Sequence, residues 1–373
     1  MDIKSRLVPL RSRPITPRAI RVEASSACQL RCPACPTGQG HTGKNACGTG
    51  FLRIDDFDRL LRNNPTITEI ELSNWGEVFL NPHFSRILEH AHRAEVGITI
   101  RNGANLNHVS DEALEALVKY QLSELVVALD GACDETYRLY RVNGNFDRVI
   151  ANIKKINALK KRYQSSKPLL IWQFVLFGHN EHEIAAARRY ARELRMAFSP
   201  RLNVVPDYSS LRDAARTLKE AGLTNPEIGD DWNASICNQL WKSPQINWDG
   251  KILGCCHNNW SHFGGNAFTG SLAESLNTEK LRYARAMLRG RAPPRADIPC
   301  TDCAAYKARA FQRKWISETQ MQFELLATRL PMVRRLYKTC KRSRFLDWLR
   351  RNSIVRRLRG SHRTAQTPAV VPF

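Results

Sequence analysis

Short apolar runs alternate with amphipathic stretches between Ala19 and about residue 205. Each run is too apolar for a strand with one face in water, and helical spacing follows it, which is the pattern of βα units in a parallel sheet. The pattern predicts an α/β fold in which six βα units form an open, partial barrel, with a flat doubly wound sheet as the structural alternative. The predicted strands cover residues 19–25, 67–72, 97–101, 124–129, 169–177 and 198–205.

Polar residues mark the predicted starts of several helices. Ser110 precedes Asp111 and Glu112, a cap followed by two acidic residues that favour a first helical turn. Asn180, with Glu183 three residues on, has the pattern of a capping box, so a second helix is expected to begin there. Other helices are predicted near residues 55–62, 83–94 and 146–162.

The regular alternation ends near residue 205, and the composition then changes. The next residues are polar and predict a linker with a short helix, after which a cysteine-rich stretch without regular pattern indicates a small module organised by metal. The end of the chain is basic and has helical spacing. The predicted parts are a basic segment 1–18, a barrel 19–205, a linker 206–235, a cluster module 236–312 and a helical tail 313–373.

Composition narrows the class of protein. The 373 residues are 43% hydrophobic and 25% charged, which excludes wholesale disorder. The most apolar run, residues 169–177, is far shorter than the roughly 20 residues that span a bilayer, and residues 1–18 lack the apolar core of a secretory signal. These features predict a cytoplasmic protein. The net charge of +22 predicts an acidic partner.

Half of that charge lies in the tail, where residues 334–363 contain twelve Lys or Arg and one acidic residue. Within residues 334–359, Phe345, Trp348 and Leu349 have helical spacing, which predicts a basic amphipathic helix. Such a helix binds an anionic membrane surface, here the inner face of the membrane; the alternative is that its apolar face packs on the barrel. No nucleic-acid partner is expected, since the chain has no helix-turn-helix, zinc-finger or RNA-binding signature.

The eleven cysteines are unevenly spaced, and close clusters of thiols in a reducing compartment indicate metal rather than disulfides. Cys28, Cys32 and Cys35 follow the first predicted strand on one short loop. Three thiolates can bind three irons of a 4Fe-4S cluster and leave the fourth iron open, as a catalytic metal requires. The alternative is a structural zinc loop that borrows a distant fourth ligand.

The loop from Cys28 to Pro36, C-x-L-x-C-P-x-C-P, resembles the cluster loop of the radical S-adenosylmethionine (SAM) superfamily, in particular of its SPASM-bearing branch. The resemblance implies a partial (β/α)6 barrel in which the open iron chelates S-adenosylmethionine. Reductive cleavage of this cofactor then yields a 5′-deoxyadenosyl radical that abstracts hydrogen from a substrate. It also implies an electron donor such as flavodoxin or ferredoxin.

Later segments extend the resemblance and imply further cofactor contacts. Gly76 and Glu77 resemble the family's G-G-E-P segment, and Asn102 its T-N-G turn. Arg141 resembles the arginine of R-x2-G-x-F and would pair with the cofactor carboxylate, although a solvated arginine is the alternative. Gln173, in the middle of an apolar strand, is interpreted as a contact inside the barrel rather than only a buried hydrogen-bonded residue.

A second set of thiols lies beyond the barrel. Cys237, Cys255, Cys300 and Cys303 provide four ligands, suited to a 4Fe-4S cluster or to a zinc ribbon. The surrounding sequence resembles the SPASM/twitch extension, which implies one auxiliary 4Fe-4S cluster, because too few cysteines remain for a second. The spacing after Gly250 favours Cys255 over its neighbour as the ligand.

The leading functional prediction is a radical SAM enzyme that dehydrogenates or epimerises a sugar or other polyol, including lipid-linked ones. In an epimerisation, Cys256 or Cys133 could return the hydrogen atom. The first alternative is a peptide-modifying radical SAM/SPASM maturase, for which residues 1–18 are expected to be too short to form a peptide-binding wing. The second is a non-enzymatic metal scaffold that binds nucleic acid.

Overall fold

The structure is a computed structural model, and it describes residues 14–203, 205, 208–223, 236–319, 321 and 325. Most of the basic N-terminal segment, parts of the predicted linker and the amphipathic helix predicted at residues 334–359 lie outside the described residues. Among the residues described, no helix combines the length and the apolar character needed to cross a bilayer.

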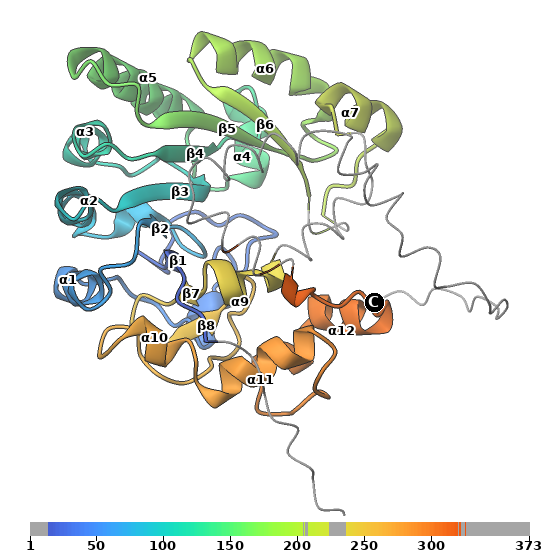
Figure 1. The fold of residues 1–373 in the computed structure, drawn as a ribbon. Coiled ribbons are helices and arrows are strands. Elements are labelled where there is room, and N and C mark those ends of the chain that lie inside the picture. Colours follow the sequence, from blue (N-terminus) through green and yellow to red (C-terminus); the bar gives the residue numbers. More distant parts are fainter. Residues whose placement is uncertain are drawn as a thin grey trace, which may run out of the picture. The chain divides into compact units, whose positions relative to one another are not determined.

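The described chain is built on one eight-stranded sheet (Figure 1). Strands β1 to β6 pair in chain order and all in parallel. This order does not reverse at any point, whereas a doubly wound sheet has a reversal. The prediction of an α/β fold with a parallel sheet is confirmed. The strands are β1 Ala19–Val22, β2 Glu69–Glu71, β3 Gly97–Ala104, β4 Glu124–Ala128, β5 Leu169–Leu176 and β6 Ala197–Leu202.

Helices connect successive strands, and Figure 1 shows them along one side of the sheet. The predicted cap is confirmed at Ser110, whose side chain accepts a hydrogen bond from the amide of Ala113 at 3.1 Å. These helices are α1 Ile54–Asn63, α2 Phe84–Arg93, α3 Asp111–Lys119, α5 Phe146–Arg162 and α6 Ile184–Glu193. The sequence pattern did not predict α4 Asp134–Tyr140; α7 Ala214–Ala221 is the short helix of the predicted linker. Short 3-10 turns cover Thr42–Lys44, Val78–Leu80, Glu181–Glu183 and Pro299–Asp302.

Strand β5 shows how the core forms. Trp172 and Phe174 are fully buried, and the Trp172 ring packs against Phe146 of α5 and Tyr190 of α6. Burial of a large apolar side chain contributes roughly 1.5–3 kcal/mol, so this layer stabilises the fold. Because neighbouring residues of a strand point to opposite faces, Gln173 lies on the face away from these helices.

The prediction of a capping box at Asn180 and Glu183 is wrong. A 3-10 turn covers Glu181–Glu183, α6 begins at Ile184, and neither polar side chain caps it. Asn180 is instead buried, accepts a hydrogen bond from the amide of Phe177 at 2.8 Å, and donates to the carbonyl of Asp130 at 3.0 Å. Its side chain therefore joins the end of β4 to the end of β5.

Glu183 is also used outside its own helix. Its carboxylate accepts hydrogen bonds from the amide of Ala132 at 3.0 Å and the hydroxyl of Thr136 at 2.6 Å. These bonds fix the start of α4. Tertiary contacts thus override a local capping pattern, because both side chains find buried partners on a neighbouring loop.

The C-terminal part of the described chain continues the barrel sheet. Its strand β7, Gln245–Ile246, pairs in parallel with β1, and β8, Ile252–Gly254, pairs with β7 in antiparallel. The Arg21 side chain of β1 donates to the Gln245 side chain at 3.0 Å. The cysteine-rich module is therefore joined to the barrel through a shared sheet. Its helices are α9 Gln239–Lys242, α10 Leu272–Ser275, α11 Glu279–Leu288 and α12 Ala304–Phe311.

Candidate iron–sulfur and cofactor site

The three predicted cluster thiols lie on the loop after β1. The amide of Cys35 donates to the carbonyl of Cys32 at 3.1 Å, and a side chain at Gly38 would collide with the Cys32 backbone at 2.7 Å, so the loop is tightly turned. Burial, together with the nearby Glu77, Cys32 and Cys35, raises the pKa of Cys28 to about 12. The loop therefore brings the three thiols close enough to interact.

Two donors face these sulfur atoms. The side-chain amide of Asn105 lies 4.0 Å from the sulfur of Cys28, and Nη1 of Arg141 lies 3.7 Å from the sulfur of Cys32. Donors of this kind stabilise thiolate, the form of cysteine that binds iron. The sulfur-only set on this loop fits a 4Fe-4S cluster.

Arg141 is held by a buried carboxylate. Its Nε and Nη2 lie 2.6 and 2.5 Å from one oxygen of Asp130, whose other oxygen accepts a hydrogen bond from the amide of Val175 at 2.7 Å. Burial opposes the charge on Arg141, but Asp130 and the Cys32 thiol keep its pKa well above the ordinary value. The structure thus places Arg141 between Asp130 and the cluster loop. Its contact with a cofactor carboxylate stays a prediction.

The Gly76–Glu77 turn packs directly on the start of the cluster loop. A Cβ at Gly76 would lie 2.1 Å from the carbonyl oxygen of Ser25, so glycine is required here. The two oxygens of Glu77 accept hydrogen bonds from the amides of Phe79, at 3.2 Å, and Asn105, at 2.7 Å. Burial raises the pKa of Glu77 to about 7. The Glu77 carboxylate therefore links the β2 and β3 ends.

Glu23 is a site residue that the sequence reasoning missed. It is fully buried at the end of β1, and its oxygens accept hydrogen bonds from the amides of Trp75, at 2.9 Å, and Gly76, at 3.3 Å. Burial raises its pKa to about 7, while those bonds lower it. The signal in the sequence was a carboxylate between the apolar residues Val22 and Ala24 of the predicted first strand, where a buried charge needs a specific partner.

Amide side chains gather at one edge of the barrel, just after β2 and within β3 and β5. Asn102 donates to the carbonyl of Asn74, and Asn74 donates to the carbonyl of Cys256 at 3.1 Å. Gln173 is buried next to Gly103, where an added Cβ would lie 3.0 Å from its Nε2. This edge therefore offers hydrogen-bonding groups rather than an apolar surface.

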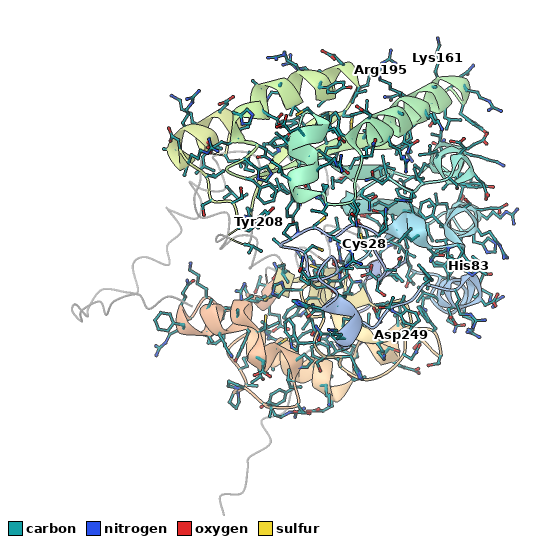
Figure 2. All side chains as sticks on the ribbon, turned by 180° about the vertical axis from the view of Figure 1, so that it is seen from behind. Cys28, His83, Lys161, Arg195, Tyr208 and Asp249 are labelled. Carbon is teal, nitrogen blue, oxygen red and sulfur yellow. The ribbon has the colours of Figure 1, made fainter. Side chains whose placement is uncertain are left out.

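Aromatic rings form another wall, which the sequence reasoning also missed. The rings of Tyr140 and Phe177 are 4.5 Å apart, those of Phe177 and Tyr208 are 5.5 Å apart, and Arg141 lies over the Tyr140 ring at 5.1 Å. Figure 2 labels Tyr208 and Cys28. Burial and the nearby Cys32 thiol raise the pKa of the Tyr208 phenol. Planar ligand groups could stack here.

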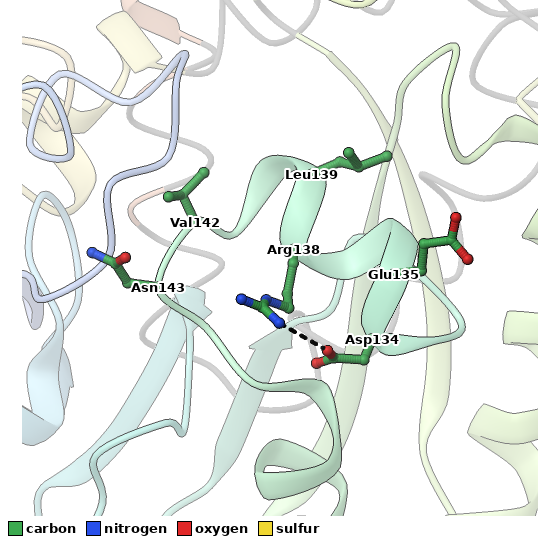
Figure 3. A pocket seen from close by; sticks show the side chains of 6 residues that line it. All are labelled: Asp134, Glu135, Arg138, Leu139, Val142 and Asn143. Carbon is green, nitrogen blue, oxygen red and sulfur yellow. Dashed lines mark ion pairs between the residues drawn. The ribbon is translucent and has the colours of Figure 1, made fainter.

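A pocket of about 390 Å³ lies on α4 and the turn after it (Figure 3). Its Arg138 and Asp134 form an ion pair at 3.6 Å. The carbonyl of Val142, on the pocket wall, accepts a hydrogen bond from the amide of Arg31 in the cluster loop at 3.1 Å. The pocket contains none of the predicted site residues; its lining is Asp134, Glu135, Arg138, Leu139, Val142 and Asn143.

The second set of thiols comes together from three separate segments. Cys237 and Cys303 are near enough to raise the pKa of Cys300, and Cys256 and Cys300 act in the same way on Cys255; burial is the larger cause in both cases. In the described part of the chain, no three His, Cys, Asp or Glu side chains converge as tightly as one metal ion requires. A cluster of four irons holds its ligands farther apart, and four thiols suit it.

The adjacent Cys255 and Cys256 have different surroundings. The amide of Cys256 donates to Oε1 of Gln239 at 2.7 Å, and its sulfur lies 3.3 Å from Nε2 of the same residue. Its carbonyl accepts the bond from Asn74. Cys255 interacts with both Cys256 and Cys300, and Cys256 lies against the end of β2. The role of Cys255 as a ligand stays a prediction.

Two of the remaining cysteines are described, and both have partners outside the two sets. Cys133 is exposed at the start of α4, and its sulfur lies 3.4 Å from a carboxylate oxygen of Glu183. Cys47 is buried, and its carbonyl accepts hydrogen bonds from the side chains of Asn247, at 2.9 Å, and Trp248, at 2.8 Å. Those two bonds attach the module to the segment after the cluster loop. Cys340 lies outside the described residues.

Comparisons with known proteins decide the family. The model of the radical SAM superfamily matches residues 22–191, and that of the SPASM iron–sulfur cluster-binding domain matches residues 237–304. The chain is a radical SAM protein with a SPASM domain. The two domains bring 4Fe-4S clusters and S-adenosylmethionine as cofactors.

Solved structures share this fold. SuiB of Streptococcus suis, bound to the precursor peptide SuiA, is 16% identical, with a TM-score of 0.56 over 78% of this chain and 70% of SuiB. SuiB bound to S-adenosylmethionine is also 16% identical, with a TM-score of 0.55 over 78% and 71%. BtrN in complex with AdoMet and 2-DOIA is 14% identical, with a TM-score of 0.47 over 78% and 94%. No curated protein matches the chain.

Proposed function

We propose that this radical SAM/SPASM protein abstracts hydrogen from a sugar, cyclitol or related polyol and epimerises it, with dehydrogenation as the alternative outcome. The observation that carries the proposal is the contact between Asn74 and Cys256, which lies 182 residues away in the sequence. It holds the backbone of Cys256 at the edge of the barrel where amide side chains gather, while the thiol of this residue lies 3.3 Å from Nε2 of Gln239. When bound, the cofactors supply the 5′-deoxyadenosyl radical.

The residues around the cluster loop would hold these cofactors. Cys28, Cys32 and Cys35 are the proposed iron ligands, and Arg141, held by Asp130, orients Cys32. The electron enters from a donor such as flavodoxin or ferredoxin.

S-adenosylmethionine would bind between the loop and the strand ends. The Gly76–Glu77 turn, fixed by Glu23, offers backbone carbonyls to its ammonium group. Arg141 is proposed to reach its carboxylate, and the rings of Tyr140 and Tyr208 offer faces for its adenine.

The side-chain amides at the barrel edge support the proposal of a substrate rich in hydroxyl groups. Asn102 and Gln173 both donate and accept hydrogen bonds, as sugar hydroxyls require. After a hydrogen atom has left a substrate carbon, the Cys256 thiol would return one to the opposite face; its S–H bond breaks and a C–H bond forms. The sulfur radical that remains would take one electron from the electron donor and one proton from solvent, which restores the thiol. Cys133 is a weaker candidate, since its thiol faces Glu183 at the start of α4.

Solvent deuterium tests this proposal. Thiol hydrogens exchange with water, so an epimerisation in D2O should place one deuterium in each product molecule. Anaerobically reconstituted protein is screened with sugars and cyclitols for substrate-dependent 5′-deoxyadenosine, and products are analysed by mass. Cys256→Ala should abolish deuterium incorporation and Cys133→Ala should preserve it. An oxidised product without deuterium, formed equally by both variants, would reject epimerisation in favour of dehydrogenation.

Peptide modification is the second candidate function. It is supported by the likeness of the fold to SuiB, whose structure contains a precursor peptide. In the same assay, 5′-deoxyadenosine formation that responds to peptides and not to polyols would favour it. A non-enzymatic scaffold has less support, because radical SAM membership indicates an enzyme.

The tail provides a separate proposal that rests on composition alone. Residues 334–359 would bind anionic lipid at the inner membrane surface, where lipid-linked glycans occur. Full-length protein should sediment with anionic vesicles and not with neutral ones, and should dissociate at high salt. Sedimentation that is unchanged by truncation after Pro331 would contradict this role.

A further inference from the structure

Two cysteines stand side by side in the SPASM domain, Cys255 and Cys256, and the predicted auxiliary cluster takes only one of them. Both are thiols, so their chemistry alone does not decide which one binds iron. Only Cys256 is contacted at two points by the side chain of Gln239. These two contacts bear on which sulfur is available to the cluster.

The direction of both contacts follows from the groups that make them. A backbone amide only donates hydrogen bonds, so the Gln239 atom that lies 2.7 Å from the amide of Cys256 is the carbonyl oxygen Oε1. The NH2 group of the same carboxamide then faces the sulfur at 3.3 Å and donates to it. The hydrogen of the Cys256 thiol takes no part in this contact.

The backbone of Cys256 is held on its other side as well. Its carbonyl accepts a hydrogen bond from Nδ2 of Asn74 at 3.1 Å. With the amide held by Gln239 and the carbonyl held by Asn74, the residue cannot swing as a unit. Only a rotation about its Cα–Cβ bond would move the sulfur elsewhere, and the bond from Nε2 opposes that rotation.

Gln239 is itself fixed by the fold. It is the first residue of the short helix α9, in which Leu240 and Trp241 are buried. The amide of Trp241 donates to the carbonyl of Asn238 at 3.1 Å. This turn comes directly after Cys237, a predicted ligand of the auxiliary cluster. The side chain that holds Cys256 therefore belongs to a segment that supplies another ligand.

We infer that Gln239 is a positioning residue, whose carboxamide keeps the Cys256 thiol away from the auxiliary cluster and so makes Cys255 the ligand. The inference rests on the predicted ligand role of Cys255 and on no particular substrate. A thiol kept free in this way is available for the proposed return of hydrogen, which is a separate claim.

A rescue experiment on the reconstituted full-length protein tests the inference by iron content, without any substrate. Cys255→Ala should hold about four irons per chain, because alanine has no donor atom and Gln239 keeps Cys256 from the vacant position. Adding Gln239→Ala to this variant should restore about eight, because the released thiol becomes the fourth ligand. Asn238→Ala, which changes the neighbouring side chain of the same turn, is the matched control and should restore none.

EPR of the reduced protein provides a second readout. The signal of the auxiliary cluster should return in the doubly substituted protein and disappear again when Cys256→Ala is added. A merely structural role of Gln239 would not restore a cluster.

Gln239→Glu covers the case in which Gln239→Ala does not fold. It retains an oxygen for the amide of Cys256 and removes the donor to the sulfur, so it should also restore iron in the Cys255→Ala background. A full iron content in Cys255→Ala alone, or no recovery with either substitution of Gln239, would overturn the inference.

Discussion

The two sets of thiols differ in how the chain assembles them. Residues 28–35 form one loop with its own backbone hydrogen bonds, at the end of a parallel strand. The SPASM set is collected from Cys237, Cys255 and the turn at Cys300–Cys303. A local loop keeps its shape without metal, whereas thiols from distant segments depend on the fold around them and on the bound cluster.

The two regions also differ in the number of proposed ligands. Three cysteines would leave one iron open for a cofactor, and four would close the auxiliary site. The arginine beside the first set, Arg141, is paired with Asp130. On this assignment, the first site is arranged to bind a further ligand and the second is closed by its thiols.

The strongest test of this division removes a thiol from the cluster loop. Cys32→Ala should reduce 5′-deoxyadenosine formation below detection, because no other residue of the loop replaces this ligand. The auxiliary cluster should remain, since the two sites share no ligands. Iron analysis and an anaerobic cleavage assay measure both effects, with Cys133→Ala as the control. Retained cleavage would show that this loop does not hold the catalytic cluster.

The next test removes a thiol from the SPASM set. Cys255→Ser should lower the iron content from about eight to about four per chain, because a 4Fe-4S cluster loses one of its four ligands. Cys256→Ser should leave the iron content unchanged, since its sulfur bonds Gln239. The reverse result would make Cys256 the ligand and remove it from the proposed epimerisation.

A third test breaks the ion pair between Arg141 and Asp130. Asp130→Asn leaves the partly buried Arg141 without its counter-charge. Loss of one partner of a buried pair costs about 3–5 kcal/mol in the free energy of unfolding, and this pair should lie at the lower end of that range. Thermal or denaturant unfolding measures it. Asp111→Asn, which removes the exposed ion pair with Lys155, should cost less than about 1 kcal/mol. Equal effects of the two substitutions would contradict the account of Asp130.

The smallest expected effect is a change in how the stability of the fold depends on pH. Burial raises the folded-state pKa of Glu23 to about 7, above the ordinary 4.5, so its contribution to stability is complete below pH 4.5 and is lost as the pH rises through 7. Between pH 6 and 8 this loss amounts to about 1 kcal/mol. Glu23→Gln should remove that part of the pH dependence in thermal unfolding. The exposed Glu112→Gln should retain it, and identical profiles would contradict the assignment.

Local patterns predicted much of the fold. Apolar periodicity located the strands and the main helices, and the cap at Ser110 follows from its neighbours alone. The capping box at Asn180 and Glu183 failed because both side chains bond to the loop after β4. Periodicity also could not predict β7, a two-residue strand that depends on pairing with β1.

The residues of the candidate site also divide into those that local sequence patterns predicted and those that they could not predict. Spacing identified Cys28, Cys32 and Cys35, which lie within eight residues of one another. It could not predict the bond between Asn74 and Cys256, or the bonds from Glu23 to the Trp75–Gly76 turn, because these contacts join segments that only the folded sheet brings together.

The measurement that tests the central claim most directly is the content and activity of the purified, anaerobically reconstituted protein. Two clusters predict about eight iron and eight sulfide per chain. With S-adenosylmethionine and a reductant, the protein should produce 5′-deoxyadenosine. Bound zinc in place of iron and sulfide, with no cleavage of the cofactor, would contradict the account.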